Sequence, residues 1–208
     1  WVSATFAIMS DLAMGMLAGK LKVKEKLTGR FADVLSWLFI ASAVIKRFED
    51  EGRRPEDKIF LDISMAIAFH KIQDAFDGIF GNMDVFGLYW FFKGPLRWWS
   101  RLNFLGLAPT DRLTHRVADA LMYNPEQRAR LTQGIFKPTA PGEALVRLEN
   151  AYVAIRKAEP VERKIRAAVW NRQLNKKSKT LLDDAVKAGV ITGQEQALVV
   201  EADKLRWD

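Results

Sequence analysis

The sequence predicts an all-α protein, a bundle of antiparallel helices followed by a smaller C-terminal helical subdomain that ends in a helical hairpin. Apolar residues recur every three or four positions along most of the chain, as they do on one face of a helix. Capping residues and Gly or Pro stops separate these stretches, and no convincing strand, repeat or low-complexity tract appears. We place the bundle at residues 1–109 and the subdomain at 110–208.

The first predicted helix, residues 1–17, is small and apolar on nearly all sides, which indicates packing between neighbouring helices. Asp11 is the exception, and we expect it to pair with a basic residue or to lie exposed rather than to act as a catalytic base. A basic turn at residues 20–28 leads to the next helix.

The central helix is predicted at residues 29–53, with Thr28 as its cap and Gly52 as its stop. At 1.5 Å per residue it is roughly 35 Å long, enough to form the central column of a small domain. Its expected buried stripe consists of Phe31, Val34, Leu35, Leu38, Ala41, Ile45 and Phe48.

A third helix follows Pro55 and ends at Gly81 and Asn82, so that three helices run up, down and up. Its expected buried stripe consists of Leu61, Met65, Ala68, Ile72, Phe76 and Ile79. His70 lies in this helix without the preceding Glu of a Glu-x-x-His metal motif, so we expect an ordinary, partly buried histidine.

Residues 85–107, which we call the aromatic segment, have the most unusual composition in the chain, and Gly94 and Pro95 should break them into two short helical pieces. An interfacial helix combines such aromatic side chains with basic ones. Aromatic residues are also enriched at protein interfaces, so the sequence leaves a lipid surface and a protein partner open. The candidate contact residues are Trp90, Phe91, Phe92, Lys93, Arg97, Trp98, Trp99, Arg101 and Phe104.

In the second half, Thr110 and the pair Asn124–Pro125 each open a helix. A longer helix around Tyr152 is expected to restart at Pro160. The final hairpin turns at Gly189, and Thr192 with Glu195 three residues later forms a capping box.

Composition limits the classes of function. The 208 residues include 32 Lys and Arg against 25 Asp and Glu, and no Cys, which excludes disulfides and thiol chemistry. The basic runs at 20–30 and 163–179 predict solvated helix faces or an anionic partner. Nucleic acid is not expected, because the Trp and Phe residues lie away from the Lys-rich runs. The uncharged stretch 34–45 is shorter than the ~20 residues of a membrane span, so we expect surface binding without crossing.

Motifs for catalysis, nucleotide binding and metal binding are absent from the sequence. We therefore assign no catalytic, cofactor-binding or metal-binding residue to this chain. Lys46 and Arg47 precede Asp50 and Glu51 by four positions, which predicts a structural ion-pair cluster at the end of the central helix.

Residues 29–53, GRFADVLSWLFIASAVIKRFEDEGR, resemble the signature helix of the C-terminal domain of bacterial long-chain acyl-CoA dehydrogenases. Five further stretches agree: LKVKEKLTGR, APTDRLTHRVADAL, RLTQGIF, ALVRLENAYVAIRKAEPVERKI and AVKAGVITGQEQALVVEAD. The chain starts within a helix at Trp1, and we expect it to be a fragment of such an enzyme.

The resemblance implies that the parent enzyme oxidises acyl-CoA to trans-2-enoyl-CoA in fatty-acid β-oxidation, with FAD bound by the upstream core and none by this chain. We expect a homodimer; the absence of Cys fits a cytoplasmic setting, and the aromatic segment favours peripheral binding to the inner membrane. The chain would serve dimerisation, membrane docking or covering of the acyl-CoA site. The alternative is a free-standing, non-catalytic helical module that binds an anionic membrane surface or a protein.

Overall fold

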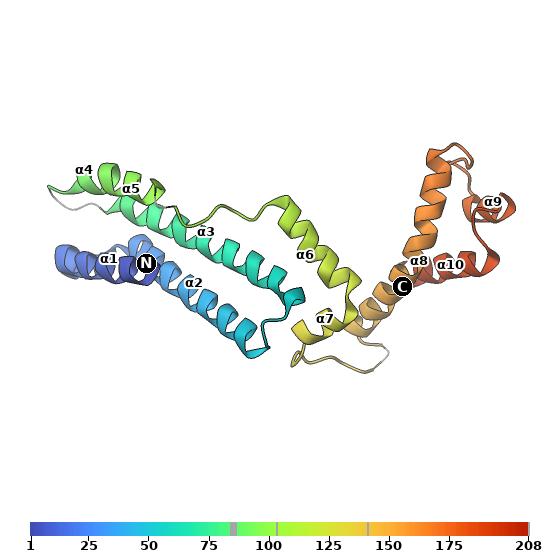
Figure 1. The fold of residues 1–208 in the computed structure, drawn as a ribbon, viewed down its shortest axis with the longest axis horizontal. Coiled ribbons are helices and arrows are strands. Elements are labelled where there is room, and N and C mark those ends of the chain that lie inside the picture. The colour runs from blue at the N-terminus through green and yellow to red at the C-terminus, as the bar shows by residue number, and fades with distance from the viewer. Residues whose placement is uncertain (84–86, 103, 141, 208) are drawn as a thin grey trace. The chain divides into compact units, whose positions relative to one another are not determined.

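The computed structural model describes residues 1–83, 87–102, 104–140 and 142–207 (Figure 1). Every regular element in these ranges is helical, which confirms the predicted all-α class. The chain divides into two compact units, Trp1–Gln133 and Gly134–Asp208.

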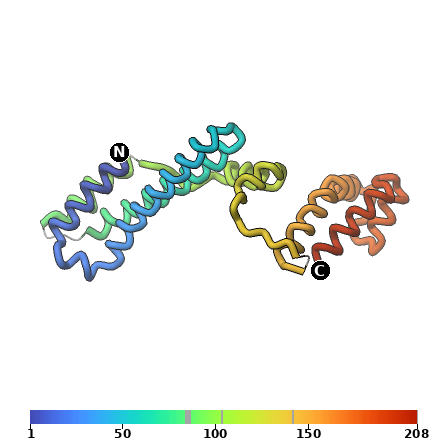
Figure 2. Tube along the Cα trace, turned by 90° about the horizontal axis from the view of Figure 1, so that it is seen from below, coloured from blue at the N-terminus to red at the C-terminus, as the bar shows by residue number. Residues whose placement is uncertain are grey.

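The first unit begins with α1 (Val2–Leu17), η1 (Ala18–Val23), α2 (Glu25–Asp50), η2 (Pro55–Asp57) and α3 (Lys58–Asn82). The ribbon and the Cα trace show α1, α2 and α3 running back along one another, as the sequence predicts (Figures 1 and 2). Phe76 and Phe80 stack in the core with ring centroids 5.8 Å apart. The buried core side chains are Met9, Ala13, Leu17, Leu27, Val34, Ile72, Ala75, Phe76, Ile79, Phe80, Met83 and Phe92.

The start of α2 differs from the prediction. The helix begins at Glu25, and Thr28 lies inside its first turn, where its hydroxyl donates to the carbonyl oxygens of Leu21 and Lys24. Thr28 therefore ties the helix to η1 and does not cap it. The stop is as expected, because Gly52 and Arg53 both adopt positive φ, 87° and 52°.

The buried stripe of α2 is narrower than predicted. Val34 and Ala41 are buried and Leu38 is half-buried, but Leu35 and Ile45 are exposed. The prediction was wrong for these two residues because α2 is apolar on both its core side and its opposite side, so spacing alone did not separate them. In α3 the predicted Ala68, Ile72, Phe76 and Ile79 are buried, whereas Leu61 and Met65 are half-buried.

The first unit continues with α4 (Tyr89–Phe91), η3 (Phe92–Leu96), α5 (Arg97–Leu102), α6 (Asp111–Tyr123) and α7 (Pro125–Leu131). Gly94 and Pro95 do not separate two helices as expected; they lie in η3, a π-helical turn that connects α4 directly to α5. Thr110 Oγ1 and Asn124 Oδ1 accept from the backbone N–H groups of Leu113 and Gln127, the caps that the sequence predicts.

Residues 110–133 pack with the first unit, whereas the sequence suggested a division between residues 109 and 110. Helix α6 contacts α3, and a buried polar cluster connects α7 to η2. Gln127 Nε2 donates to Glu56 O at 2.6 Å and to Asp57 Oδ1 at 3.0 Å, and the guanidinium of Arg130 lies 3.3 Å from Asp57 Oδ1. These contacts join residues about 70 positions apart and left no local pattern in the sequence.

The second unit consists of α8 (Ala144–Trp170), α9 (Leu181–Lys187) and α10 (Gly193–Trp207). Helix α8 does not restart at Pro160; it continues through it, and its ribbon bends midway, as a helix does at an internal proline (Figure 1). The backbone N–H of Thr192 donates to Glu195 Oε2 at 2.8 Å and that of Glu195 to Thr192 Oγ1 at 3.2 Å, so the capping box is confirmed. The core is Ala158, Val161, Ile165, Ala168, Leu174, Ala185, Ile191, Val199 and Ala202.

Candidate functional site

The described part of the aromatic segment is held on α3 by a buried amide. Gln73 Nε2 donates to Ser100 Oγ at 3.0 Å, and Gln73 Oε1 accepts from the backbone N–H of Leu105 at 3.2 Å. Both Gln73 and Ser100 are buried. A Cβ on Gly106 would lie 3.1 Å from Phe69 Cβ, so the backbone after α5 also lies close to α3. Ser100 of α5 therefore faces the protein interior.

The apolar side of the segment faces outward. Trp90 is 68% exposed and Trp98 is 67% exposed, and Phe91, Trp99 and Phe104 are exposed as well. Phe92 differs from the sequence expectation: it is 2% exposed and belongs to the core of the first unit, so it anchors the segment and cannot contact a surface. Residues 85, 86 and 103 of the segment lie outside the described residues. The segment thus exposes large aromatic side chains, while Phe92 and Ser100 attach it to the core.

The three candidate cations lie in different environments. Lys93 is exposed, with its Nζ 3.9 Å from the centroid of the Tyr89 ring. Arg101 Nε lies 3.8 Å from the half-buried Asp77 Oδ2, and this pair connects α5 to α3. Arg97 is half-buried, and no described residue accepts a hydrogen bond from its buried Nε. Lys93 therefore provides positive charge beside an exposed aromatic ring, whereas the charge of Arg101 is paired with Asp77.

Trp1 adds a residue that sequence reasoning missed. Its ring lies 5.7 Å from that of Trp99, centroid to centroid, and Trp1 is itself exposed. The two residues are far apart in the sequence, so no local spacing could have indicated the contact. The fold thus adds the N-terminal end of α1 to the outward aromatic surface of α5.

The acidic and basic residues at the end of α2 form the pairs that their spacing allows. Lys46 Nζ lies 2.5 Å from Asp50 Oδ1, and Arg47 Nε lies 2.7 Å from Glu51 Oε1. Glu49 pairs with Arg53 in the same way. All three pairs are well exposed to solvent, and such pairs contribute little to stability. The predicted ion-pair cluster is therefore present, and its role in anchoring the turn after α2 stays a prediction.

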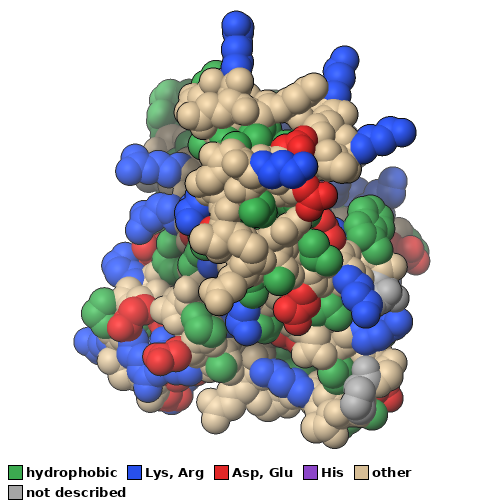
Figure 3. Space-filling view, turned by 90° about the vertical axis from the view of Figure 1, so that its right-hand side faces the viewer, with side chains coloured by type: hydrophobic (Ala, Val, Ile, Leu, Met, Phe, Trp, Pro, Cys, Tyr) green, Lys and Arg blue, Asp and Glu red, His purple; other side chains and the backbone are tan. Residues whose placement is uncertain are grey.

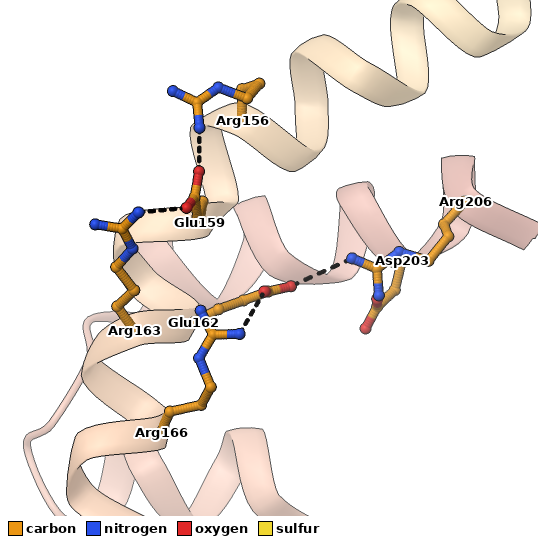
Figure 4. A network of polar contacts seen from close by, with 7 residues as sticks. All are labelled: Arg156, Glu159, Glu162, Arg163, Arg166, Asp203 and Arg206. Carbon is orange, nitrogen blue, oxygen red and sulfur yellow. Dashed lines mark hydrogen bonds and ion pairs between the residues drawn. The ribbon is translucent and has the colours of Figure 1, made fainter. Parts of the chain in front are cut away.

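The basic run in α8 is largely neutralised by the fold. Glu159 pairs with Arg156 and Arg163, while Glu162 pairs with Arg166 and with Arg206 of α10 (Figure 4). Arg206 also lies 3.3 Å from Asp203 Oδ1 (Figure 4). Lys164 Nζ lies 2.5 Å from Glu195 Oε1. On the face of the molecule in Figure 3, acidic side chains likewise lie among the projecting Lys and Arg side chains.

The carboxyl of Glu195 in the second unit has a shifted pKa. The ammonium of Lys164 and the N–H of Thr192 donate to Glu195 and lower the pKa of its carboxyl below the ordinary value of 4.5. His70 Nε2 lies 3.6 Å from Asp74 Oδ2. Among the residues that the structure describes, no three His, Asp or Glu side chains are grouped to hold a metal ion.

The comparison with protein families identifies the chain. The family model described as acyl-CoA dehydrogenase, C-terminal, bacterial type, matches residues 1–208. The chain therefore belongs to this family, the one that residues 29–53 resemble, and it is the C-terminal domain of an acyl-CoA dehydrogenase. No solved structure matches it.

Proposed function

We propose that this domain docks an FAD-dependent acyl-CoA dehydrogenase of fatty-acid β-oxidation on the cytoplasmic face of an anionic membrane, through the aromatic segment. The observation that carries this proposal is the exposure of the tryptophans: α5 buries Ser100 against Gln73, while Trp98 of α5 and Trp90 of α4 stay exposed. Such an arrangement is favourable only where the aromatic side chains leave bulk water.

The chemistry of the exposed residues fits the head-group layer of a bilayer. Trp and Tyr rings favour this layer, and each basic side chain near an anionic leaflet contributes about 1 kcal/mol before salt screening. Lys93 lies over the exposed Tyr89 ring and supplies that attraction, whereas the charge of Arg101 is paired with Asp77. The short helices α4 and α5 would lie in the interface plane, so binding is reversible and salt-sensitive.

Membrane docking suits the reaction that the family carries out. Long-chain acyl groups partition into lipid, so an enzyme held at the membrane surface meets its substrate where that substrate is concentrated. The dehydrogenase oxidises acyl-CoA to trans-2-enoyl-CoA, and this domain contributes location, not chemistry.

FAD is assigned to the dehydrogenase portion of the enzyme. A cavity of about 530 Å³ in the second unit is lined by Lys164, Asn171, Gln173 and small apolar residues, without an aromatic ring to stack on a flavin. The residues around it do not fit the cofactor, and we derive no catalytic step through this chain.

The proposal is tested by fractionating cells that express the intact enzyme. We expect yellow, acyl-CoA-oxidising enzyme in the membrane fraction at low salt and its release by a high-salt wash. Enzyme that stays in the soluble fraction at every salt concentration would contradict membrane docking. In that case the exposed aromatic rings become candidates for a subunit interface, where aromatic residues are also enriched.

A further inference from the structure

Helix α2 carries a second apolar side, directly opposite the one that enters the core. Val34 and Ala41 face the core, while Ala32, Leu35, Phe39 and Ala43 lie exposed on the other side. Phe39 is 74% exposed. A helical stretch that is apolar all round, as residues 34–45 are, is ordinarily buried on all sides, and no described element of the first unit covers this side of α2.

Helix α1 has the same character. Met9 and Ala13 are buried, and Ile8, Leu12 and Met14 are exposed. The two helices contact each other through Phe6 and Phe31, whose ring centroids lie 6.3 Å apart. We call the exposed apolar side chains of these helices, Ile8, Leu12, Met14, Leu35 and Phe39, the outer apolar face.

The helices of this face have the length and composition of membrane spans, at residues 2–23 and 25–50, and only a small share of either is buried. The sequence expectation was that neither crosses a membrane. Charge favours a protein partner: Asp11 lies exposed among the apolar residues of α1, and no Lys or Arg occurs between residues 2 and 19.

We propose that the outer apolar face packs against the dehydrogenase portion of the same polypeptide. This inference rests on the proposed function, in which that portion precedes the domain. Covalent connection gives the two parts a high effective concentration, and permanent interfaces are the most apolar ones. Small residues beside the face, such as Ala7, Gly15 and Ala32, allow a partner helix to approach closely.

The acidic residues distinguish this partner from a second copy of the domain. Asp11 and Asp33 are exposed and form no ion pair with a described residue, and the face offers no cation to them. A two-fold dimer through this face would bring the carboxylates of Asp11 and Asp33 close to those of the second copy, where like charges repel. A dehydrogenase surface with a Lys or Arg opposite Asp11 would form an ion pair with this carboxylate.

The absence of Cys from this chain allows a direct test. Phe39→Cys would be introduced into both the intact enzyme and the 208-residue chain, with Trp170→Cys as a matched control in the second unit, where Trp170 is 88% exposed. Both would be reacted with a charged maleimide, and labelling at each site would be followed by peptide mass spectrometry. We expect similar rates at both sites in the isolated chain. In the intact, active enzyme, labelling at site 39 should slow at least tenfold while site 170 is unchanged.

Three results would overturn the inference. Rapid labelling at site 39 in the intact enzyme would show that the face stays uncovered. Protection in the isolated chain that rises with protein concentration would indicate a second copy, and protection that requires added vesicles would indicate lipid. Rapid labelling at site 39 in an active flavoenzyme would contradict this inference and leave the proposed function standing. An intact protein without a dehydrogenase portion would contradict both.

Discussion

Gln73 and Ser100 meet in the interior of the first unit, where the amide of Gln73 donates to the serine hydroxyl at 3.0 Å. Gln73 Oε1 also accepts a hydrogen bond from the backbone N–H of Leu105, so this one side chain fixes both α5 and the coil segment that follows it. Because this contact turns Ser100 inward, it leaves Trp98 and Trp99 of α5 facing outward. The proposed membrane surface therefore depends on a buried hydrogen bond that no lipid touches.

Gln73→Leu is expected to destabilise the first unit by about 1–3 kcal/mol, because it leaves the buried hydroxyl of Ser100 and the N–H of Leu105 without their partner. Urea unfolding of the 208-residue chain measures this. The double variant Gln73→Leu, Ser100→Ala is the control, and it should cost less than the sum of the two single changes. Strict additivity would mean that the two side chains do not interact.

Ile72→Ala is expected to cost about 2–5 kcal/mol, because Ile72 is fully buried between α2 and α3 and its truncation leaves a cavity. Ile8→Ala removes the same atoms from an exposed position in α1 and should change the unfolding free energy of the isolated chain by less than about 0.5 kcal/mol. Thermal or urea unfolding compares them. Equal effects would show that the core has been assigned to the wrong side of these helices.

The ion pair between Lys164 and Glu195 is expected to make the stability of the second unit depend on pH. The pKa of Glu195 is lowered in the folded state, mainly by the hydrogen bond from Lys164. The contribution of the Glu195 carboxylate to stability is therefore fully present above the ordinary pKa of 4.5. It is lost as the pH falls through the lowered pKa of the folded state.

Unfolding of the wild type and of Glu195→Gln should differ at neutral pH and converge in acid. Glu201→Gln, an exposed position in the same helix, serves as the control and should follow the wild type at every pH. A difference for Glu195→Gln that persists unchanged in acid would assign the effect to helix capping through Thr192 instead of charge.

Local patterns in the sequence predicted most of the elements, because periodicity, caps and glycine stops are short-range features. They were sufficient for the stop of α2 at Gly52 and for the capping box at Thr192 and Glu195. Local patterns failed where a helix has two apolar sides, as α2 does at Leu35. Spacing does not indicate which of the two sides packs against a neighbouring helix.

The candidate site was predicted only in part for a related reason. The exposed Trp90 and Trp98 followed from composition, but the burial of Phe92 and the contact of Trp1 with Trp99 depend on how distant helices pack. The same holds for Gln73, whose role appears only when α5 lies on α3. Residues joined across the fold leave no trace in the local sequence.

Co-sedimentation of the 208-residue chain with lipid vesicles tests membrane docking most directly. The variant Trp90→Ala, Trp98→Ala, Lys93→Glu changes three exposed residues of the aromatic segment. The matched control Trp170→Ala, Trp207→Ala, Lys179→Glu changes equivalent exposed residues of the second unit. The account predicts that wild type and control bind anionic vesicles at low salt and are released at high salt, while the folded segment variant stays in the supernatant. Equal binding by the wild type and the segment variant, or no binding by the wild type, would contradict it.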